Sequence, residues 1–401
     1  MIPVPEAKSL IRNNVKRLPV RKVAVENAAG LTLAENVIAP FDIPSFHQSS
    51  MDGYAIAFDS LKLTEGKIDT GSTIFRIAGE SPAGSQHDVL VLPGEVARIF
   101  TGAALPADTD TIIIQERTES TDGGIRINRH QAEKGQFVRV PGAEIRAEEI
   151  ALHEGHLLTP ASVSYLASIG VVNVVVYPSP LVTIVVTGDE FIERGRSPQK
   201  GKVFESNSIG LTAALRQAGV TNVRILYTAD TIEDTVQAMK KACSESNLVL
   251  FTGGVSVGDY DFVASAADAN GITKLFHRVA QKPGKPLFFG KSDTVTLFGL
   301  PGNPSSVLTC FYEYVLIALH QLTGRSLELR SEQVTLKQEY RKPEGLMHFL
   351  KAHCENGSVA ALSAQESFKL SSFATANCLV VLPESTTVAK VNEPVTIHWL
   401  P

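Results

Sequence analysis

Several segments of this chain bring glycines and charged residues to points where apolar runs end. The stretch FTGGVSVGDYDF, residues 251–262, closes an apolar run with a glycine pair and then supplies two carboxylates, Asp259 and Asp261. Glycines leave backbone N–H groups free to approach an anion closely. The acids would repel that anion unless a hard cation lay between them, and Mg²⁺ binds carboxylates and phosphate oxygens together. The stretch therefore predicts a magnesium-dependent nucleotide or phosphate site.

Three further segments carry the same kinds of residue. TGDE at 187–190 and TAD ending at Asp230 follow apolar runs, and LPGNPSS at 300–306 follows a third. KPGKP holds Lys282 and Lys285 in a turn stiffened by Pro and Gly, where two ammonium groups suit phosphate or another oxyanion. A lone Asp in such a loop is more often a turn former or helix cap. Together, at successive strand ends, the segments favour a binding site.

The elements that must position these segments follow from the pattern after Leu181. LVTIVVTG, VRILYTAD, NLVLFTGG, KLFHRVAQK and TVTLFGL have the composition of strands, and the first suits a strand buried on both faces. Helical patterns lie between them at 206–219 and 231–246 and after them at 304–324. Alternating strands and helices predict an open, mainly parallel sheet. Such sheets bind ligands at the carboxyl ends of their strands, where these loops should gather.

The rest of the chain differs in its pattern of predicted helices and strands, which predicts an α/β multidomain protein. We expect a discontinuous N-terminal domain of mixed helix and strand at 1–40 and 138–178, which includes a capped helix after Thr159. A β-rich domain at 41–137 would be inserted into it. The α/β domain would span 179–325. Five short strand patterns at 326–401 predict a small C-terminal β-barrel.

Composition excludes several classes of protein. The 401 residues are 44% hydrophobic and 20% charged, as in globular proteins, and the net charge of −5 argues against a nucleic-acid-binding surface. No signal peptide or membrane-spanning stretch is present, so we expect a cytoplasmic protein. The four cysteines are scattered, which argues against structural zinc and favours buried, reduced thiols. The P-loop, GxGxxG and GxSxG motifs are all absent.

The motifs together resemble one family, the MoeA/gephyrin E-domain proteins or molybdopterin molybdenumtransferases. The matching stretches are SSMDGYAI, RIFTGAALPADTDTIIIQE, EGHLLTPASVSYLASIG, VVTGDE, ESNS, FTGGVSVGDYDF, KPGKPLFFG and GLPGNPSS. The resemblance implies an elongated four-domain homodimer whose α/β domain is MogA-like. It implies an enzyme that inserts molybdate into adenylylated molybdopterin with Mg²⁺ and releases AMP. Its active cleft would lie between the α/β domain of one subunit and the inserted domain of the other.

The resemblance also implies roles for individual residues. Asp52 and Thr101 would lie in the cleft on the side of the inserted domain, and Lys282 and Lys285 would hold the oxyanion or phosphate. Glu190, Asp230 and Asp261 would bind Mg²⁺ directly or through water. The residues expected to bind adenylylated molybdopterin are Thr187, Gly188, Ser206, Asn207, Gly253, Gly254, Ser256, Pro301, Gly302, Asn303, Pro304 and Ser305.

Some positions depart from the family pattern. In the C-terminal domain the usual Gly-Arg is Gly345-Leu346, and Ser367 is kept. Glu366, Phe368 and Cys378 stand where small residues are common. The contribution of this domain to the molybdate site is therefore an open question.

Two other functions stay open at this point. The α/β domain is similar to MogA-like adenylyltransferases, which load AMP onto molybdopterin, although those proteins usually consist of that domain alone. Such a protein is also a possible partner. The gephyrin E domain also serves as a receptor scaffold, but this chain keeps nearly all of the acids. Tungstate is close to molybdate in size and charge, and the sequence does not separate the two.

Overall fold

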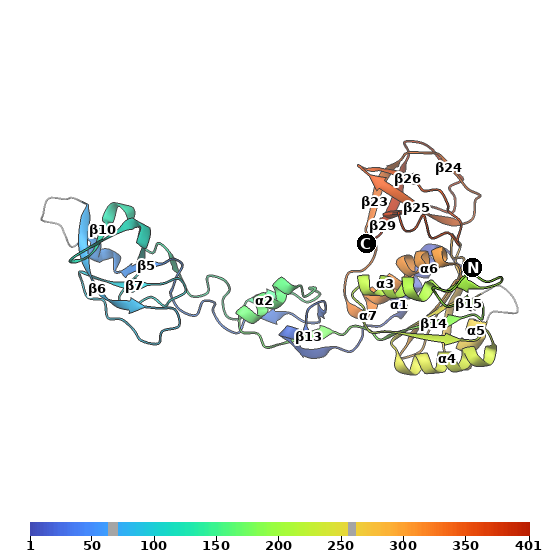
Figure 1. Cartoon of the computed structure of the whole chain (residues 1–401), viewed down its shortest axis with the longest axis horizontal. Helices are drawn as coiled ribbons and strands as arrows, with labels where there is room; N and C mark the ends of the chain where they lie inside the picture. The colour runs from blue at the N-terminus through green and yellow to red at the C-terminus, as the bar shows by residue number, and fades with distance from the viewer. Residues whose placement is uncertain (63–70, 256–261) are drawn as a thin grey trace.

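The computed structural model describes residues 1–62, 71–255 and 262–401 of the chain. Figure 1 shows an elongated molecule with a β-rich part at one end, a narrow middle part and a larger end that holds both termini. The larger end contains an α/β part with a β-barrel beside it. The chain thus runs out to the β-rich end and returns, and the two passages lie side by side in the middle.

The α/β part is built on a sheet with the strand order β17-β14-β18-β22-β21-β19. β17, β14, β18 and β22 are parallel to one another, whereas β21 runs antiparallel to both β22 and β19. The bounds are β14 Val182–Thr187, β17 Val223–Thr228, β18 Leu248–Thr252, β19 Thr273–Arg278, β21 Pro286–Lys291 and β22 Thr296–Leu300. The mainly parallel sheet is confirmed, but β21 is a strand that the sequence analysis did not predict.

Helices cover both faces of this sheet. Successive residues of β14 face opposite cores: Ile184 packs in the core with residues of α3 and α6, and Val185 packs in the core with residues of α4 and α5. This explains the unbroken apolar run, because a strand covered on both faces has no solvent side. The bounds are α3 Asn207–Gln217, α4 Ile232–Glu245, α5 Phe262–Ala269 and α6 Pro304–Cys310.

The long apolar helix predicted at 304–324 is interrupted in the structure. A π-helical turn at Phe311–Val315 joins α6 to α7 (Leu316–Thr323). Gly324 ends the helix in the left-handed conformation, with φ 67°. The π turn carries Glu313, which is 2% exposed.

Glu313 connects three parts of the larger end. Its Oε2 lies 2.5 Å from Lys8 Nζ of α1 (Val4–Asn14), and its Oε1 lies 2.8 Å from His398 Nδ1 of the last barrel strand. The apolar side chains of α1 pack in the same core as α3 and α7. The N-terminal helix thus makes its apolar contacts with the α/β part, and the four domain boundaries themselves remain predictions.

The C-terminal part closes into a barrel. The strands follow the order β25-β26-β23-β29-β27, and β27 pairs back with β25. The bounds are β23 Ser331–Leu336, β25 Met347–Glu355, β26 Ser358–Ala361, β27 Cys378–Leu382 and β29 Pro394–Trp399, with the short pair β24 Tyr340–Arg341 and β28 Val388–Ala389. The five predicted strands are confirmed. β20 (Gln281–Lys282), from the α/β part, pairs in parallel with the start of β25.

The far end holds a sheet with the order β8-β5-β7-β6-β10-β9. Its bounds are β5 Gly53–Ile56, β6 Ser72–Ser81, β7 Glu95–Ile99, β8 Thr111–Ile114, β9 Thr118–Thr121 and β10 Gly124–Asn128. Short 3-10 turns span Phe58–Lys62, Gln115–Arg117 and Arg129–Gln131 in this part. Another, Val25–Asn27, follows β1 in the middle part.

The middle part combines segments from both sides of the inserted sheet. It has the three-stranded order β1-β13-β2 beside α2 (Pro160–Ser168), whose predicted cap Thr159 accepts a hydrogen bond from Ser162 N. Two short antiparallel pairs, β3 with β12 and β4 with β11, link it to the inserted sheet. The bounds are β1 Arg21–Ala24, β2 Thr32–Leu33, β3 Val37–Ile38, β4 Gln48–Ser49, β11 Val138–Arg139, β12 Ile150–Leu152 and β13 Asn173–Tyr177. The predicted fold class is therefore confirmed. No helix within the described ranges is long and apolar enough to cross a membrane.

The buried carboxylate predicts how the larger end responds to mutation. Glu313→Gln should lower the free energy of unfolding by roughly 3 kcal/mol, because Lys8 and His398 lose their charged partner. The exposed pair Glu339–Arg341 supplies the matched control Glu339→Gln, which should change it by less than about 1 kcal/mol. Urea unfolding of the full chain measures both.

The same pair of variants predicts a pH effect. Burial alone would raise the pKa of Glu313, but Lys8 and His398 outweigh burial and hold the pKa below its ordinary value. The ionised form thus contributes stability at neutral pH, which is lost as the pH falls below the ordinary glutamate range. Glu313→Gln should show a shallower loss of stability in acid than wild type, whereas an equally steep loss would contradict this role.

Candidate functional site

A cavity of 760 Å³ opens at the carboxyl edge of the α/β sheet. β14 lies between β17 and β18, and the chain leaves β14 toward β17 and later returns to β18 on its other side. Ligands of open α/β sheets bind where the strand order reverses in this way. The lining residues are Thr187, Glu190, Phe191, Val203, Phe204, Glu205, Ser206, Asn207, Thr252, Gly253, Gly254, Val255, Pro286, Pro301, Gly302, Asn303, Pro304 and Phe368.

The glycine pair at the end of β18 forms one wall of this cavity. Gly253 and Gly254 have φ angles of 87° and 63°, which side chains rarely tolerate. A Cβ atom at Gly253 would lie 2.6 Å from Thr187 Oγ1 and 2.8 Å from the Thr187 carbonyl oxygen. Only bare backbone therefore fits beside the end of β14, and the cavity wall there is made of peptide groups.

A second wall comes from the loop before α6 and the start of α3. Asn207 Nδ2 donates to the Gly302 carbonyl oxygen at 2.8 Å, which joins the two segments. Asn207 Oδ1 and Ser305 Oγ are buried without a hydrogen-bond partner in the described chain. Buried polar atoms normally have partners, so Asn207 Oδ1, whose residue lines the cavity, indicates a polar ligand at this wall.

Of the acids predicted for a cation, Glu190 lines the cavity and Asp230 lies close to its glycine wall. Burial raises the pKa of Asp230, and the nearby charges of Glu190 and Asp189 raise it further. A Cβ atom at Gly254 would lie 3.9 Å from Asp230 Oδ1, so this carboxylate is close to the glycine wall. The described residues hold no ready-made group of three or more His, Cys, Asp or Glu side chains for a metal ion. Three carboxylates that repel one another nevertheless mark a place where a cation would be stabilised.

Most residues expected to bind the substrate do gather here. Thr187, Ser206, Asn207, Gly253, Gly254 and the four residues Pro301–Pro304 line the cavity. Gly188 and Ser305 are adjacent in sequence to lining residues but do not line it themselves. Ser256 and Asp261, together with Asp259, lie outside the described residues.

The two lysines are placed less directly than expected. Pro286 lines the cavity, whereas neither Lys282 nor Lys285 does, and both are exposed. Buried Gln281 shapes this turn, since its Nε2 donates to the carbonyl oxygens of Pro283 and Gly284 at 3.1 Å each. The turn thus borders the cavity with its lysines at the surface beside it.

Asp52 and Thr101 form a cluster of their own at the other end of the molecule. Asp52 Oδ1 accepts hydrogen bonds from Thr101 N at 2.7 Å and Thr101 Oγ1 at 2.8 Å. These bonds, with the charge of Arg98, hold the pKa of Asp52 below its ordinary value. The pair belongs to the inserted sheet, far from the α/β part in Figure 1. Within one chain, the structure does not bring these residues to the cavity.

The barrel contributes a wall that the sequence analysis left open. The Ser367 carbonyl oxygen accepts from Ser305 N at 3.1 Å, and Ser367 Oγ accepts from Asn303 Nδ2 at 2.9 Å. Phe368 lines the cavity and is 62% exposed. Phe191 and Phe204 line it from the loop after β14, where β15 (Phe191–Ile192) pairs with β16 (Val203–Phe204). No periodicity marks these aromatic residues in the sequence.

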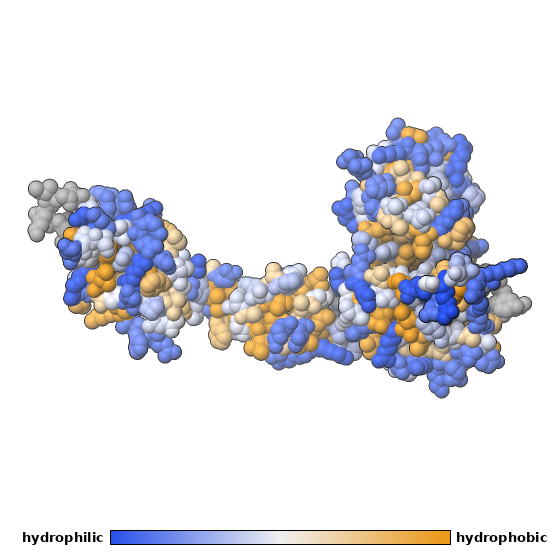
Figure 2. Space-filling model, in the orientation of Figure 1, coloured by the Kyte–Doolittle hydropathy of each residue, from blue (hydrophilic) through white to orange (hydrophobic). Residues whose placement is uncertain are grey.

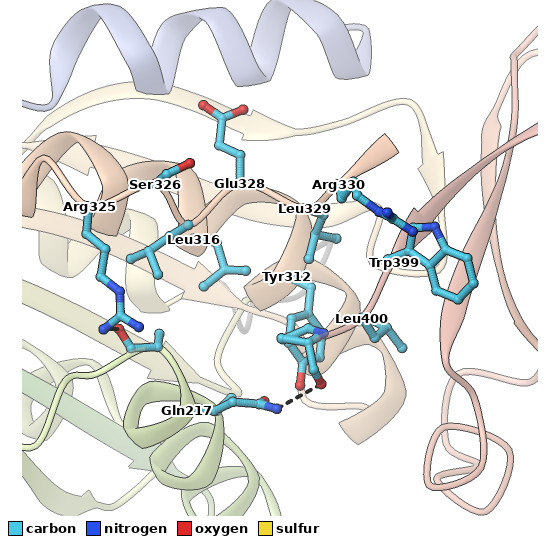
Figure 3. A pocket seen from close by; sticks show the side chains of 14 residues that line it. Gln217, Tyr312, Leu316, Arg325, Ser326, Glu328, Leu329, Arg330, Trp399 and Leu400 are labelled. Carbon is cyan, nitrogen blue, oxygen red and sulfur yellow. Dashed lines mark hydrogen bonds between the residues drawn. The ribbon is translucent and has the colours of Figure 1, made fainter. Parts of the chain in front are cut away.

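A second cavity, of 340 Å³, lies between α3, the segment 325–330 and the end of the chain (Figure 3). Its charged groups already have partners: Arg325 donates to the Ala218 carbonyl oxygen, Glu328 pairs with Arg12, and Arg330 pairs with Glu332. Gln217 Nε2 donates to the Pro401 carbonyl oxygen at 2.8 Å. This cavity therefore offers apolar packing rather than free polar groups.

The cysteines take no part in either cavity. All four are free; Cys310, Cys354 and Cys378 are buried, as predicted, and Cys243 is half-buried. Burial raises the pKa of the Cys243 thiol to about 11, which makes it a poor nucleophile at neutral pH.

Comparison with known proteins identifies matching regions along almost the whole chain. Residues 2–170 match the model of the MoeA N-terminal region (domain I and II), residues 183–321 a molybdopterin binding domain, and residues 333–400 the MoeA C-terminal region (domain IV). A molybdopterin molybdenumtransferase of Staphylococcus aureus (strain N315) is 31% identical over 99% of this chain and 95% of the relative. The corresponding protein of Haemophilus influenzae is 30% identical over 93% and 92%.

Solved structures agree with these matches. The molybdopterin biosynthesis MoeA protein of Pyrococcus horikoshii OT3 has a TM-score of 0.78 at 27% identity, with both chains covered in full. Another structure of such a protein, from Pyrococcus horikosii, has a TM-score of 0.83 at 25% identity, covering 100% of this chain and 99% of that one. The identity, the coverage and the shared architecture show that this chain belongs to the MoeA family of molybdopterin molybdenumtransferases.

Proposed function

We propose that this chain inserts molybdate into adenylylated molybdopterin at the 760 Å³ cavity, with the help of Mg²⁺ and with release of AMP. Family membership establishes the coarser statement, that it is a transferase of molybdenum cofactor biosynthesis. The details of substrate, cation and product are the proposal. The observation that carries it is the convergence of bare backbone, an unpartnered amide oxygen and repelling acids at one sheet edge.

The cavity suits a phosphorylated substrate. The wall at Gly253 and Gly254 presents peptide groups, whose N–H donors suit phosphate oxygens. Asn207 Oδ1 can accept a hydrogen bond from a substrate N–H or O–H group. Lys282 and Lys285 lie beside the cavity, where their charges attract a dianion such as molybdate or tungstate. Each of these roles belongs to the proposal.

A divalent cation fits the acidic rim. Mg²⁺ in phosphate sites uses one or two carboxylates together with substrate oxygens and waters, so a complete cage of protein ligands is not required. Asp230 and Glu190 are the described residues that would hold it, and Asp261 is a further proposed ligand. When bound, Mg²⁺ would neutralise negative charge on the phosphoanhydride and on the AMP that leaves.

The elongated chain supports a site shared between two subunits. Asp52 directly precedes β5 and Asp230 lies just before α4, and Figure 1 shows these two elements at opposite ends of the molecule, so one chain cannot join the two residues. Figure 2 shows apolar residues gathered on the narrow middle part, where Ile38, Phe41 and Val172 are exposed. Exposed apolar patches of this kind mark protein interfaces. We therefore propose that the chain forms a homodimer. We also propose that it acts in the cytoplasm and receives its adenylylated substrate from a MogA-like adenylyltransferase.

Removal of the raised-pKa acid tests the cation site. Asp230→Asn should lower molybdate- and Mg²⁺-dependent AMP release roughly tenfold or more, because the rim loses a carboxylate that lies close to the glycine wall. Asp293→Asn is the matched control, since Asp293 is exposed between β21 and β22 at the opposite edge of the sheet. Release at the wild-type rate from Asp230→Asn would refute the role of Asp230.

Mixed dimers test the shared site. Asp52→Ala and Asp230→Ala should each be inactive alone, whereas refolding them together should restore roughly a quarter of the wild-type rate, because each mixed dimer holds one intact site. AMP release measures the recovery. A mixture that stays inactive, although the mixed dimer is shown to form, would place both residues in the same chain's site or remove Asp52 from the machinery.

A further inference from the structure

Phe368 is an exposed aromatic residue in the wall of a concave site. It lines the 760 Å³ cavity and yet is 62% exposed, so much of its ring faces open space. The Lys369 ammonium lies 5.8 Å from the centre of the ring. An exposed phenylalanine within a cavity loses apolar contact that burial would have supplied. A ligand ring that covers it would restore that contact.

The loop that carries Phe368, residues 363–370, is held from within the barrel by a buried lysine. Lys351 of β25 is 2% exposed, and its Nζ donates to the carbonyl oxygens of Ala364 at 2.8 Å, Lys369 at 3.0 Å and Glu366 at 3.4 Å. Gln365 adds two hydrogen bonds with the Lys351 backbone. No carboxylate pairs with this ammonium in the described chain, so the hydrogen bonds to the loop carbonyls are what offsets the cost of burying it.

The same loop is attached to the opposite side of the cavity. Ser367, which directly precedes Phe368, forms hydrogen bonds with Asn303 and Ser305 at the start of α6. The loop is therefore fixed on both sides of the aromatic residue: by Lys351 in the barrel and by the α/β part across the cavity. This fixation gives Phe368 a defined position relative to the glycine wall.

We propose that Phe368 is a stacking platform for the fused nitrogen heterocycle of the substrate, and that Lys351 is the positioning residue that holds this platform in the cavity. The inference rests on the proposed function, because it assigns part of the same site. Phosphate groups would lie at the glycine wall and a flat ring system at Phe368. The ring is either the pterin or the adenine of adenylylated molybdopterin, and both have the π-face that stacking needs.

Binding measurements on the full chain test the platform. AMP and a phosphate-free pterin serve as separate ring probes, and ribose 5-phosphate serves as the probe that has the phosphate but no ring. Phe368→Ala should weaken one of the two ring probes roughly tenfold and leave ribose 5-phosphate unchanged, and Phe368→Trp should restore the loss. Val391→Ala, which removes an exposed apolar side chain elsewhere on the barrel, should change nothing.

The outcomes separate the inference from the proposed function. Equal affinity of Phe368→Ala and wild type for both ring probes would overturn the stacking platform alone. If the wild-type chain binds none of the three probes (AMP, the pterin and ribose 5-phosphate), the proposed function is overturned as well. The probe that weakens identifies which ring lies on Phe368.

A fluorescence experiment tests the role of Lys351. The chain has a single tryptophan, Trp399, which lines the second cavity, so Phe368→Trp places a new reporter in the site. The ring probe should quench the fluorescence of this reporter. Adding Lys351→Met to the Phe368→Trp chain should reduce the quenching, and its urea midpoint should show that the chain still folds. In binding, Lys351→Met should add nothing to the loss caused by Phe368→Ala. Fully additive losses would overturn the positioning role.

Discussion

The site depends on one steric constraint at the end of β18. The ends of β14 and β18 approach so closely that Gly253 has no room for a side chain beside Thr187. This approach is possible only for bare backbone in a left-handed conformation. It leaves peptide groups as the wall of the cavity at the point where the strand order reverses. Every other feature of the site, from the acidic rim to the loop before α6, is arranged around this wall.

The barrel belongs to the site because the larger end of the molecule is firmly joined. Glu313 connects α1, the π turn and β29, and β20 continues the α/β chain into the barrel sheet. These contacts hold the barrel against the α/β part, so that a barrel loop can supply part of a wall. Rigid neighbouring elements position functional side chains better than free loops do. The inserted sheet, in contrast, lies too far away to complete the cavity of its own chain.

Sequence patterns predicted the segments that follow strands, because parallel strands place their carboxyl ends at one edge whatever their side chains are. TGDE, TGG and PGNP are therefore found together in the structure as expected. Lys282 and Lys285 were less predictable, since a turn sequence does not determine the direction of its long side chains. β21 was missed, although PLFFG is an apolar run, because it follows the KPGKP turn so closely.

The barrel wall could not be predicted from local patterns. Asn303 and Ser367 are joined across a long stretch of chain by contacts that no local periodicity encodes. In the sequence, Phe368 stands out only as a departure from the family pattern. Lys351 carries no local signal of burial, because a lysine in a strand is usually exposed. Their roles depend on how the closed barrel packs on the α/β part. That packing is a property of the tertiary structure alone.

A crystal structure of the chain soaked with AMP, Mg²⁺ and molybdate would test the central claim most directly. The account predicts an AMP phosphate within hydrogen-bonding distance of the backbone at Gly253 and Gly254, with the cation beside Asp230. AMP bound instead in the apolar cavity of Figure 3, with nothing at the glycine wall, would contradict it.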